Sequence, residues 1–494
     1  MDEPAKRRFS IRLFEVLEQQ GYTSTRIKHR SKALAIMIER LHIPHCSSSE
    51  IIVAGSVGEG ISKLGSSDID MIYIVPEVMC VDEGPNEKGI LVARNKFTQT
   101  PPGYVRLQVD DSFTGATGIP LRTSLVSGKR YLDNTAIKQF LQNMCEEKQY
   151  PRNTEINGPA VTSYGAGSRF MQVLPELLKA LPFFSNATLR LGNNGQNGDT
   201  DVVIGLPFYS SKILDNWLNR ERLHEWPSKA LQDKIAAMMG YVVPVGHKSS
   251  PVRNTEWRIS YTTAEKKLVR SMNNVQVKLY VVLKLVRKER LKPVCPNFTS
   301  YMVKNLVFWV LELTPISRFT PHNLVDIIMS ALRILKRFLT NNILPCYIIP
   351  DRNLLVERMN EEERNALLEA VECYIAEDYE IILKNPKLSM SMQLRYSYPE
   401  KARDYALWIA EIEDEFFLHL NAFADEITTV TGIEQITQGE DLLNAFKILF
   451  DSEEHVRGLI PLWLLIIPYD DLFTNGDLER KYTVFCNTLK NGVS

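Results

Sequence analysis

A Gly-Ser pair followed twelve residues later by two alternating aspartates constrains this chain more than any other feature. Gly55-Ser56 comes directly after the apolar run Ile51–Val53, and Asp68-Ile69-Asp70 opens a second apolar run. Residues two apart on a strand share a face, so Asp68 and Asp70 are expected on the same side of the second strand. The sequence therefore predicts a strand, a tight turn and a second strand that carries two neighbouring carboxylates.

The residue types in this segment favour metal-dependent phosphoryl chemistry. Glycine at 55 allows a sharp turn and close approach to a ligand. Ser56 offers a hydroxyl and an amide at an expected helix start, which attracts phosphate. Two ionised carboxylates side by side need cations, and oxygen ligands suit Mg²⁺ or Mn²⁺. A lone Asp-x-Asp would be typical of an exposed edge strand, but with the upstream Gly-Ser turn the pattern predicts a nucleotidyltransferase site.

A third carboxylate is expected from a neighbouring strand, because two-metal phosphoryl transfer usually needs one. Asp199 and Asp201 follow the glycine-rich loop 192–198. Asp201 opens the apolar run Val202–Ile204, whereas Asp199 lies in the turn, where aspartate is an ordinary turn former. We therefore expect Asp201 to complete the acidic set.

The change of pattern along the 494 residues predicts an α/β + α architecture. Residues 9–42 have helical apolar spacing with an interruption at Gly21-Tyr22, consistent with one bent helix or two. Short β-like runs, among them Ala187–Leu191 in an expected hairpin with Asp201–Leu206, occupy residues 51–210. We expect a two-lobed nucleotidyltransferase fold, a mixed β-sheet catalytic lobe with a helical C-terminal lobe, divided into N-terminal helices (1–50), core lobe (51–260), helical lobe (261–425) and C-terminal helical extension (426–494).

The net charge of −1 conceals a basic middle. Residues 212–304 hold 18 Lys and Arg against 7 Asp and Glu, whereas residues 305–494 hold 17 against 30. Apolar residues recur at helical spacing from Leu268 to Val286, which predicts one amphipathic helix with basic residues on its other faces. A basic segment of this kind indicates a polyanion partner. The positive charge that nucleoside triphosphates require explains it equally well.

Cysteine usage and apolar runs indicate a cytoplasmic protein. The seven cysteines are scattered and none forms a CxxC pair, so we expect reduced thiols and no structural zinc. The N-terminal residues carry no apolar core of a signal peptide. The longest apolar stretches, near 303–313 and 459–468, are too short to span a membrane.

Further segments resemble a known family. Residues 242–248 (VVPVGHK), 256–261 (EWRISY) with 264–266 (AEK), and 299–304 (TSYMVK) follow the turn and carboxylates in that order. Together they resemble the cyclic GMP-AMP synthase (cGAS)-like receptors and their male-abnormal (Mab) developmental relatives, over roughly residues 10–420. The last eighty or so residues have no counterpart that we can place.

The resemblance implies roles for nine residues. It implies that Asp68, Asp70 and Asp201 bind two Mg²⁺ or Mn²⁺ ions, and that Gly55 and Ser56 cradle the donor triphosphate. It further implies that Arg258 contacts a base, Lys284 and Ser300 hold phosphate, and Tyr301 stacks on a nucleobase. Each of the last four also has an ordinary structural explanation, the strongest being that Lys284 is a solvated lysine of the basic helix.

The resemblance also implies an activity and its trigger. Such an enzyme joins two nucleoside triphosphates, ATP and GTP, into a cyclic dinucleotide messenger of innate immunity. Vertebrate DNA-sensing members carry a His/Cys zinc insertion that nothing here matches, so double-stranded RNA is the expected activator rather than double-stranded DNA. The surface of this protein that binds RNA would consist of the N-terminal helices, with Arg26, Lys28, Arg30 and Lys32, and of the basic helix after residue 264. Two alternatives stay open, a linear oligoadenylate synthetase and a catalytically silent Mab-type scaffold protein.

Overall fold

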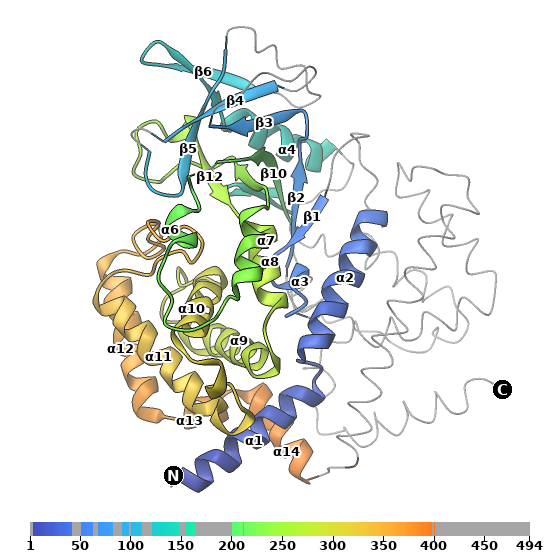
Figure 1. Ribbon diagram of the computed structural model, residues 1–494, viewed down its shortest axis with the longest axis vertical. Coiled ribbons are helices and arrows are strands. Elements are labelled where there is room, and N and C mark those ends of the chain that lie inside the picture. The colour runs from blue at the N-terminus through green and yellow to red at the C-terminus, as the bar shows by residue number, and fades with distance from the viewer. Residues whose placement is uncertain are drawn as a thin grey trace, which may run out of the picture.

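The computed structural model describes ten segments of the chain. They are residues 3–41, 51–62, 68–82, 91–97, 100–110, 121–147, 154–163, 200–210, 212–397 and residue 400. The expected strand at 187–191, with its hairpin to 201–206, and the expected C-terminal extension 426–494 lie outside these residues. Figure 1 shows the strands gathered at the top and most helices below them.

Twelve strands of the described residues form one mixed sheet, whose main path runs β1-β2-β10-β11-β12-β5-β4-β3. In that order they are Ile51–Ala54, Ile69–Ile74, Thr200–Phe208, Gly240–Val243, Glu256–Ser260, Tyr104–Gln108, Leu91–Lys96 and Val78–Val81. Two hairpins join this path, β6–β7 (Arg122–Val126 and Lys129–Asp133) and β8–β9 (Thr154–Asn157 and Ala160–Ser163). Strand β2 is antiparallel to β1 and parallel to β10, so the strands that carry Asp70 and Asp201 as their second residues are direct neighbours.

The N-terminal segment forms two helices, α1 (Glu3–Gln19) and α2 (Ser24–Leu41). The chain turns between them at Gly21, whose φ of +80° favours glycine. Helix α1 packs against α11 (Leu324–Thr340) and α14 (Pro386–Ser397), whereas α2 lies along α3 (Gly55–Gly58) and β1 (Figure 1). Residues 3–41 therefore connect the helical part of the molecule to the sheet.

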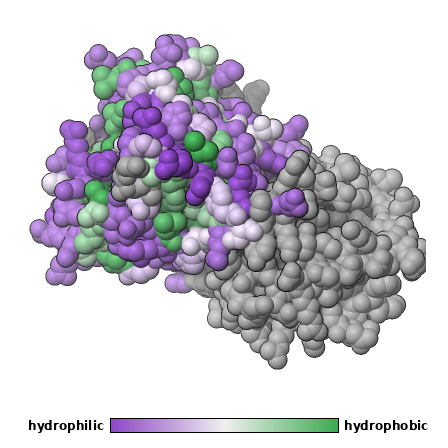
Figure 2. All heavy atoms as spheres, turned by 90° about the horizontal axis from the view of Figure 1, so that it is seen from below, coloured by the Kyte–Doolittle hydropathy of each residue, from purple (hydrophilic) through white to green (hydrophobic). Residues whose placement is uncertain are grey.

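The remaining helices lie beside or below the sheet. Those of the sheet region are α4 (Thr135–Glu147), α6 (Asp215–Leu218) and α7 (Lys229–Ala236). Those that follow it are α8 (Thr262–Arg270), α9 (Asn274–Val286), α10 (Ser300–Leu313), α11, α12 (Glu361–Glu377), α13 (Glu380–Leu383) and α14. Seen from below, this part of the molecule presents mainly hydrophilic side chains with hydrophobic ones between them (Figure 2).

The prediction of one amphipathic helix through residues 268–286 was wrong. The chain leaves α8 at Ser271 and starts α9 at Asn274. The Asn273 side chain accepts hydrogen bonds from the amides of Val275 and Gln276, and the Gln276 side chain accepts one from the Asn273 amide. This capping box begins a new helix, and helical apolar spacing alone does not reveal the break. Almost every residue of α9 is buried, so it is a core helix rather than an amphipathic one.

Most of the basic residues 266–290 that we expected to form a polyanion surface are partly or fully buried, and the polyanion contact itself stays a prediction. Only two of the eight are exposed, Lys267 and Lys288, the others being Lys266, Arg270, Lys278, Lys284, Arg287 and Arg290. Lys278 is fully buried, 3.2 Å from a Glu18 carboxylate oxygen and over the ring of Phe14. Buried amines need partners, and these lysines and arginines find them on neighbouring elements inside the molecule. Lys266, for example, donates to the Val53 carbonyl at 2.9 Å.

None of the helices in the described segments is both long enough and apolar enough to cross a membrane.

Candidate active site

The register of two parallel strands brings two predicted carboxylates together. Asp70 of β2 lies directly opposite Asp201 of β10. Thr162, on the adjacent strand β9, donates its hydroxyl to Oδ1 of Asp201 at 2.6 Å. Two aspartates separated by 131 positions in sequence (201 − 70) are thus held side by side at the start of neighbouring strands.

The Asp70 carboxylate lies so close to Gly55 that position 55 has no room for a side chain. Gly55 begins α3 with a φ of +61°, a conformation that side chains rarely adopt. A Cβ placed on it would lie 1.8 Å from Oδ2 of Asp70, well inside contact distance. Glycine at 55 is therefore required twice, by its backbone angle and by the carboxylate. The Gly-Ser turn and the Asp-x-Asp strand form one site.

Electrostatics at Asp70 fit a divalent cation. Burial, followed by the charge of Asp201, raises the pKa of Asp70 to about 7, while the Lys304 amine opposes the shift. A cation between Asp70 and Asp201 would relieve their repulsion, and a donor set made of carboxylate oxygens suits Mg²⁺ or Mn²⁺.

The predicted set of three metal ligands is not assembled in this conformation. Among the described residues, no three His, Cys, Asp or Glu side chains are arranged so that they could hold a metal ion. Asp68 is exposed just before β2, although its charge still raises the pKa of Asp70. Ligation by all three aspartates stays a prediction.

Ser62, in the turn that follows α3, links Ser56 of α3 to Lys284 of α9. Ser62 donates its hydroxyl to that of Ser56 at 2.8 Å, and Lys284 of α9 donates to the Ser62 hydroxyl at 2.9 Å. Lys284 is partly buried, and burial is the main reason that its pKa is lowered to about 8. Lys284 thus points into the site rather than into solvent. A phosphate bound at this turn would meet a hydroxyl and an amine.

Arg258 and Tyr301 lie on different elements around Arg352. Burial, followed by the charge of Arg352, lowers the pKa of Arg258 to about 10. Burial raises the pKa of Tyr301, and the same Arg352 charge opposes that rise. The hydroxyl of Tyr301 donates to Glu265 at 2.9 Å. Ser300 is exposed at the first position of α10, next to the capping residue Thr299.

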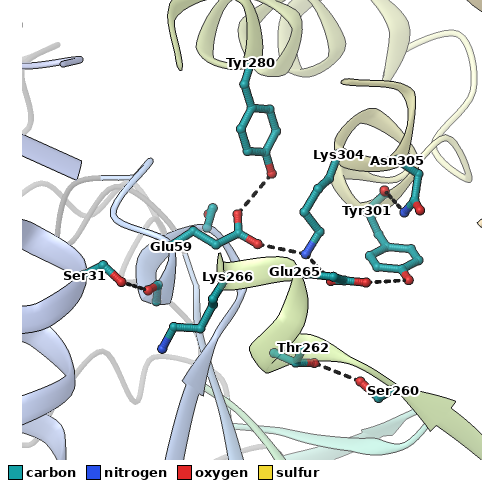
Figure 3. Close-up of polar contacts among 12 residues, drawn as sticks. Ser31, Glu59, Ser260, Thr262, Glu265, Lys266, Tyr280, Tyr301, Lys304 and Asn305 are labelled. Carbon is teal, nitrogen blue, oxygen red and sulfur yellow. Dashed lines mark hydrogen bonds and ion pairs between the residues drawn. The ribbon is translucent and has the colours of Figure 1, made fainter. Parts of the chain in front are cut away.

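A buried ion network, which the sequence patterns did not predict, lies beside these groups. Lys304 of α10 donates to Glu59 at 2.8 Å and to Glu265 at 2.6 Å, and Tyr280 donates to Glu59 at 3.2 Å (Figure 3). Burial alone would lower the pKa of Lys304, but the carboxylates of Glu265 and Glu59 raise it above its usual value. The available signal was a lysine in the mainly apolar sequence of α10, since such a charge needs a buried partner.

The site and fold define the class of protein, and one comparison supports a family. A mixed sheet whose neighbouring strands carry aspartates near their starts, beside a Gly-Ser turn, and that is followed by a run of helices, fits an α/β fold of the nucleotidyltransferase-like type. Residues 267–373 match the model of the Mab-21 protein HhH/H2TH-like domain. This match supports a relation to the Mab-21 family, which comprises nucleotidyltransferase-like proteins, some of them catalytically inactive. No curated protein matches the chain.

Proposed function

We propose that this protein is a two-lobed, cytoplasmic nucleotidyltransferase that joins ATP and GTP into a cyclic dinucleotide, with double-stranded RNA as its activator and Mg²⁺ or Mn²⁺ as its cofactor. The observation that carries the proposal is the pairing of Asp70 with Asp201 against Gly55. Folding alone does not favour two partly buried carboxylates side by side, because their repulsion and desolvation cost free energy. A cation-dependent reaction at this place explains why they are kept.

The chain's own residues have separate tasks in this reaction. Asp68, Asp70 and Asp201 would hold two divalent ions, which when bound supply charge stabilisation at the attacking hydroxyl and the leaving pyrophosphate. The Gly55-Ser56 turn and Lys284 bind the donor phosphates. Tyr301 stacks on a nucleobase, Arg258 contacts a base, and Ser300 holds phosphate together with Lys284. Catalysis is then mainly a matter of position and charge.

Two substitutions test the proposal. The purified protein is incubated with the four labelled triphosphates, Mg²⁺ or Mn²⁺, and duplex RNA, duplex DNA or neither. We expect a phosphatase-resistant product with duplex RNA, and expect Asp70→Asn and Asp201→Asn each to lower its rate by at least about a thousandfold, since the metal loses a charged ligand. Asp110→Asn, at an exposed aspartate after β5, is the matched control and should leave the rate unchanged.

Other outcomes would favour the alternatives. A product that phosphatase degrades would favour a linear synthetase. Nucleotide binding without any product under every condition would favour a catalytically silent member of the Mab-21 family. Full activity in Asp70→Asn would contradict the proposed site itself.

A further inference from the structure

The buried network around Lys304 connects three elements that carry the proposed site. Glu59 lies in the turn immediately after α3, four residues from Gly55. Glu265 lies in α8, and its other oxygen accepts the Tyr301 hydroxyl. Lys304 projects from α10 between the two carboxylates, as Figure 3 shows. Its amine is the one group in this figure that bonds both the turn and α8.

Burial restricts the positions that Lys304 and its carboxylate partners can adopt. Glu59 is 1% exposed and Lys304 is 7% exposed, so water competes little for either ion. Tyr280, buried in α9, fixes the second oxygen of Glu59. An ion held by a partner on each side, in a packed interior, has few alternative positions.

We propose that Lys304 is a positioning residue, which sets the Gly55-Ser56 turn at a fixed separation from the Tyr301 ring by bonding Glu59 and Glu265 together. The inference rests on the proposed function, because the turn is taken to bind phosphate and Tyr301 to stack on a base. Lys304 itself bonds two carboxylates and so reaches a bound nucleotide only through other residues. Its effect is to hold both contact points in register before the nucleotide arrives, which lowers the ordering cost of binding.

The same helix offers a matched control. Glu312 lies eight residues beyond Lys304 on α10, which corresponds to about 12 Å along the axis. Like Glu59 it is buried and bonds both a cation and a tyrosine, accepting from Arg220 at 2.7 Å and from Tyr347 at 2.6 Å, and it also forms an ion pair with Arg222 at 3.3 Å. Glu312→Gln and Glu59→Gln therefore disturb similar buried networks, but only Glu59 adjoins the turn.

The test compares ATP and GTP affinity, measured calorimetrically with Mg²⁺, against the thermal unfolding temperature. We expect Glu59→Gln and Lys304→Met to weaken binding at least about tenfold. Glu312→Gln should lower the unfolding temperature by a similar amount yet keep affinity within about twofold of the wild type. Lys304→Arg keeps the charge between the carboxylates and should restore most of the affinity that Lys304→Met loses.

The outcomes separate this inference from the proposed function. A wild-type protein that binds no nucleoside triphosphate contradicts both. A wild type that binds, with Glu59→Gln or Lys304→Met binding equally well, contradicts the positioning role alone, as does an equal loss in Glu312→Gln. Should Lys304→Met fail to fold, Tyr280→Phe removes only one hydrogen bond to Glu59 and is expected to weaken affinity about threefold; unchanged affinity there contradicts the inference.

Discussion

At the scale of single residues, Gly55 makes the clearest prediction. Its positive φ and the Oδ2 of Asp70 together exclude a side chain. Gly55→Ala has to change the turn or displace the Asp70 carboxylate, so we expect nucleotide affinity to fall at least about tenfold and stability to fall by about 3 kcal/mol. Calorimetric binding and urea unfolding measure the two effects.

Gly158→Ala supplies the matched control for this substitution. Gly158 lies in the turn between β8 and β9, at a φ of +64°, with nothing within 4 Å of the added Cβ. Only the backbone strain applies there, so we expect Gly158→Ala to lower folding stability by about 1 kcal/mol and to leave nucleotide affinity unchanged. Equal losses at both positions would show that contact with Asp70 is unimportant.

Local spacing foretold some of the site residues and could not have foretold others. Asp68-x-Asp70 and Gly55-Ser56 are visible because the partners lie close together in sequence and their period is that of a strand. The partner of Glu59 is 245 positions away on α10 (304 − 59), and no local period joins them. The pairing of Asp70 with Asp201 needed a guess about strand order, which the structure now shows as a parallel register.

At the scale of elements, the helices show that a count of basic residues does not reveal which of them are exposed. Counting Lys and Arg predicted a basic surface after residue 264, but partners inside the molecule hold most of those charges. Arg270, for example, donates to the Ser31 hydroxyl at 2.6 Å. The strands at 51, 69, 104 and 201 were easier to predict, because alternation and bounding turns are local properties. The α8–α9 break was not, because a capping box interrupts the chain without disturbing its apolar spacing.

Helix α2 is the element on which the expected RNA contact now depends. Its inner side reaches the α3 turn, where Arg30 donates to the Gly60 carbonyl at 3.2 Å, so Arg30 is unavailable to RNA. Lys28 and Lys32 are exposed. We expect the double substitution Lys28→Glu and Lys32→Glu to weaken duplex RNA binding and to reduce the slope of log affinity against log salt by about 1 to 2.

Titrations of labelled duplex RNA at several salt concentrations measure this slope. The control exchanges two exposed lysines on other elements, Lys129→Glu and Lys234→Glu, for the same change in net charge. A uniform loss in both double variants would indicate an effect of overall charge. An unchanged slope in the α2 variant would remove this helix from the RNA surface.

At the scale of the whole molecule, lysines from the helices hold the segment that carries the turn. Lys266 bonds the Val53 carbonyl, Lys284 bonds Ser62, and Lys304 bonds Glu59. The helical part therefore contacts β1, the turn and its continuation through three amines. Such contacts respond to charge, so the affinity of the site for phosphate should depend on pH through whichever amine titrates near neutrality.

Lys284 is that amine, because burial lowers its pKa to about 8. The charged groups that act on it are Glu59 and Asp70, which raise its pKa, and Lys304 and Arg287, which lower it further. A bound phosphate favours the protonated form, so ATP affinity should fall by about fivefold between about pH 8 and pH 9. The folding stability of the protein without nucleotide should change in the opposite direction as the pH rises. Above pH 8 the unfolded chain holds the proton that folded Lys284 has lost, so this group makes stability rise with pH until its unfolded pKa.

Lys284→Arg stays charged over this range, and its ATP affinity should therefore be flat from about pH 8 to pH 9. Binding calorimetry at matched ionic strength gives the affinities, and the same pH series under urea gives the stabilities. A wild-type affinity that does not change over this interval would mean that Lys284 does not face the bound phosphate. A fall of equal size in Lys284→Arg would assign the titration to another group, and the contact between α9 and the turn would then serve stability alone.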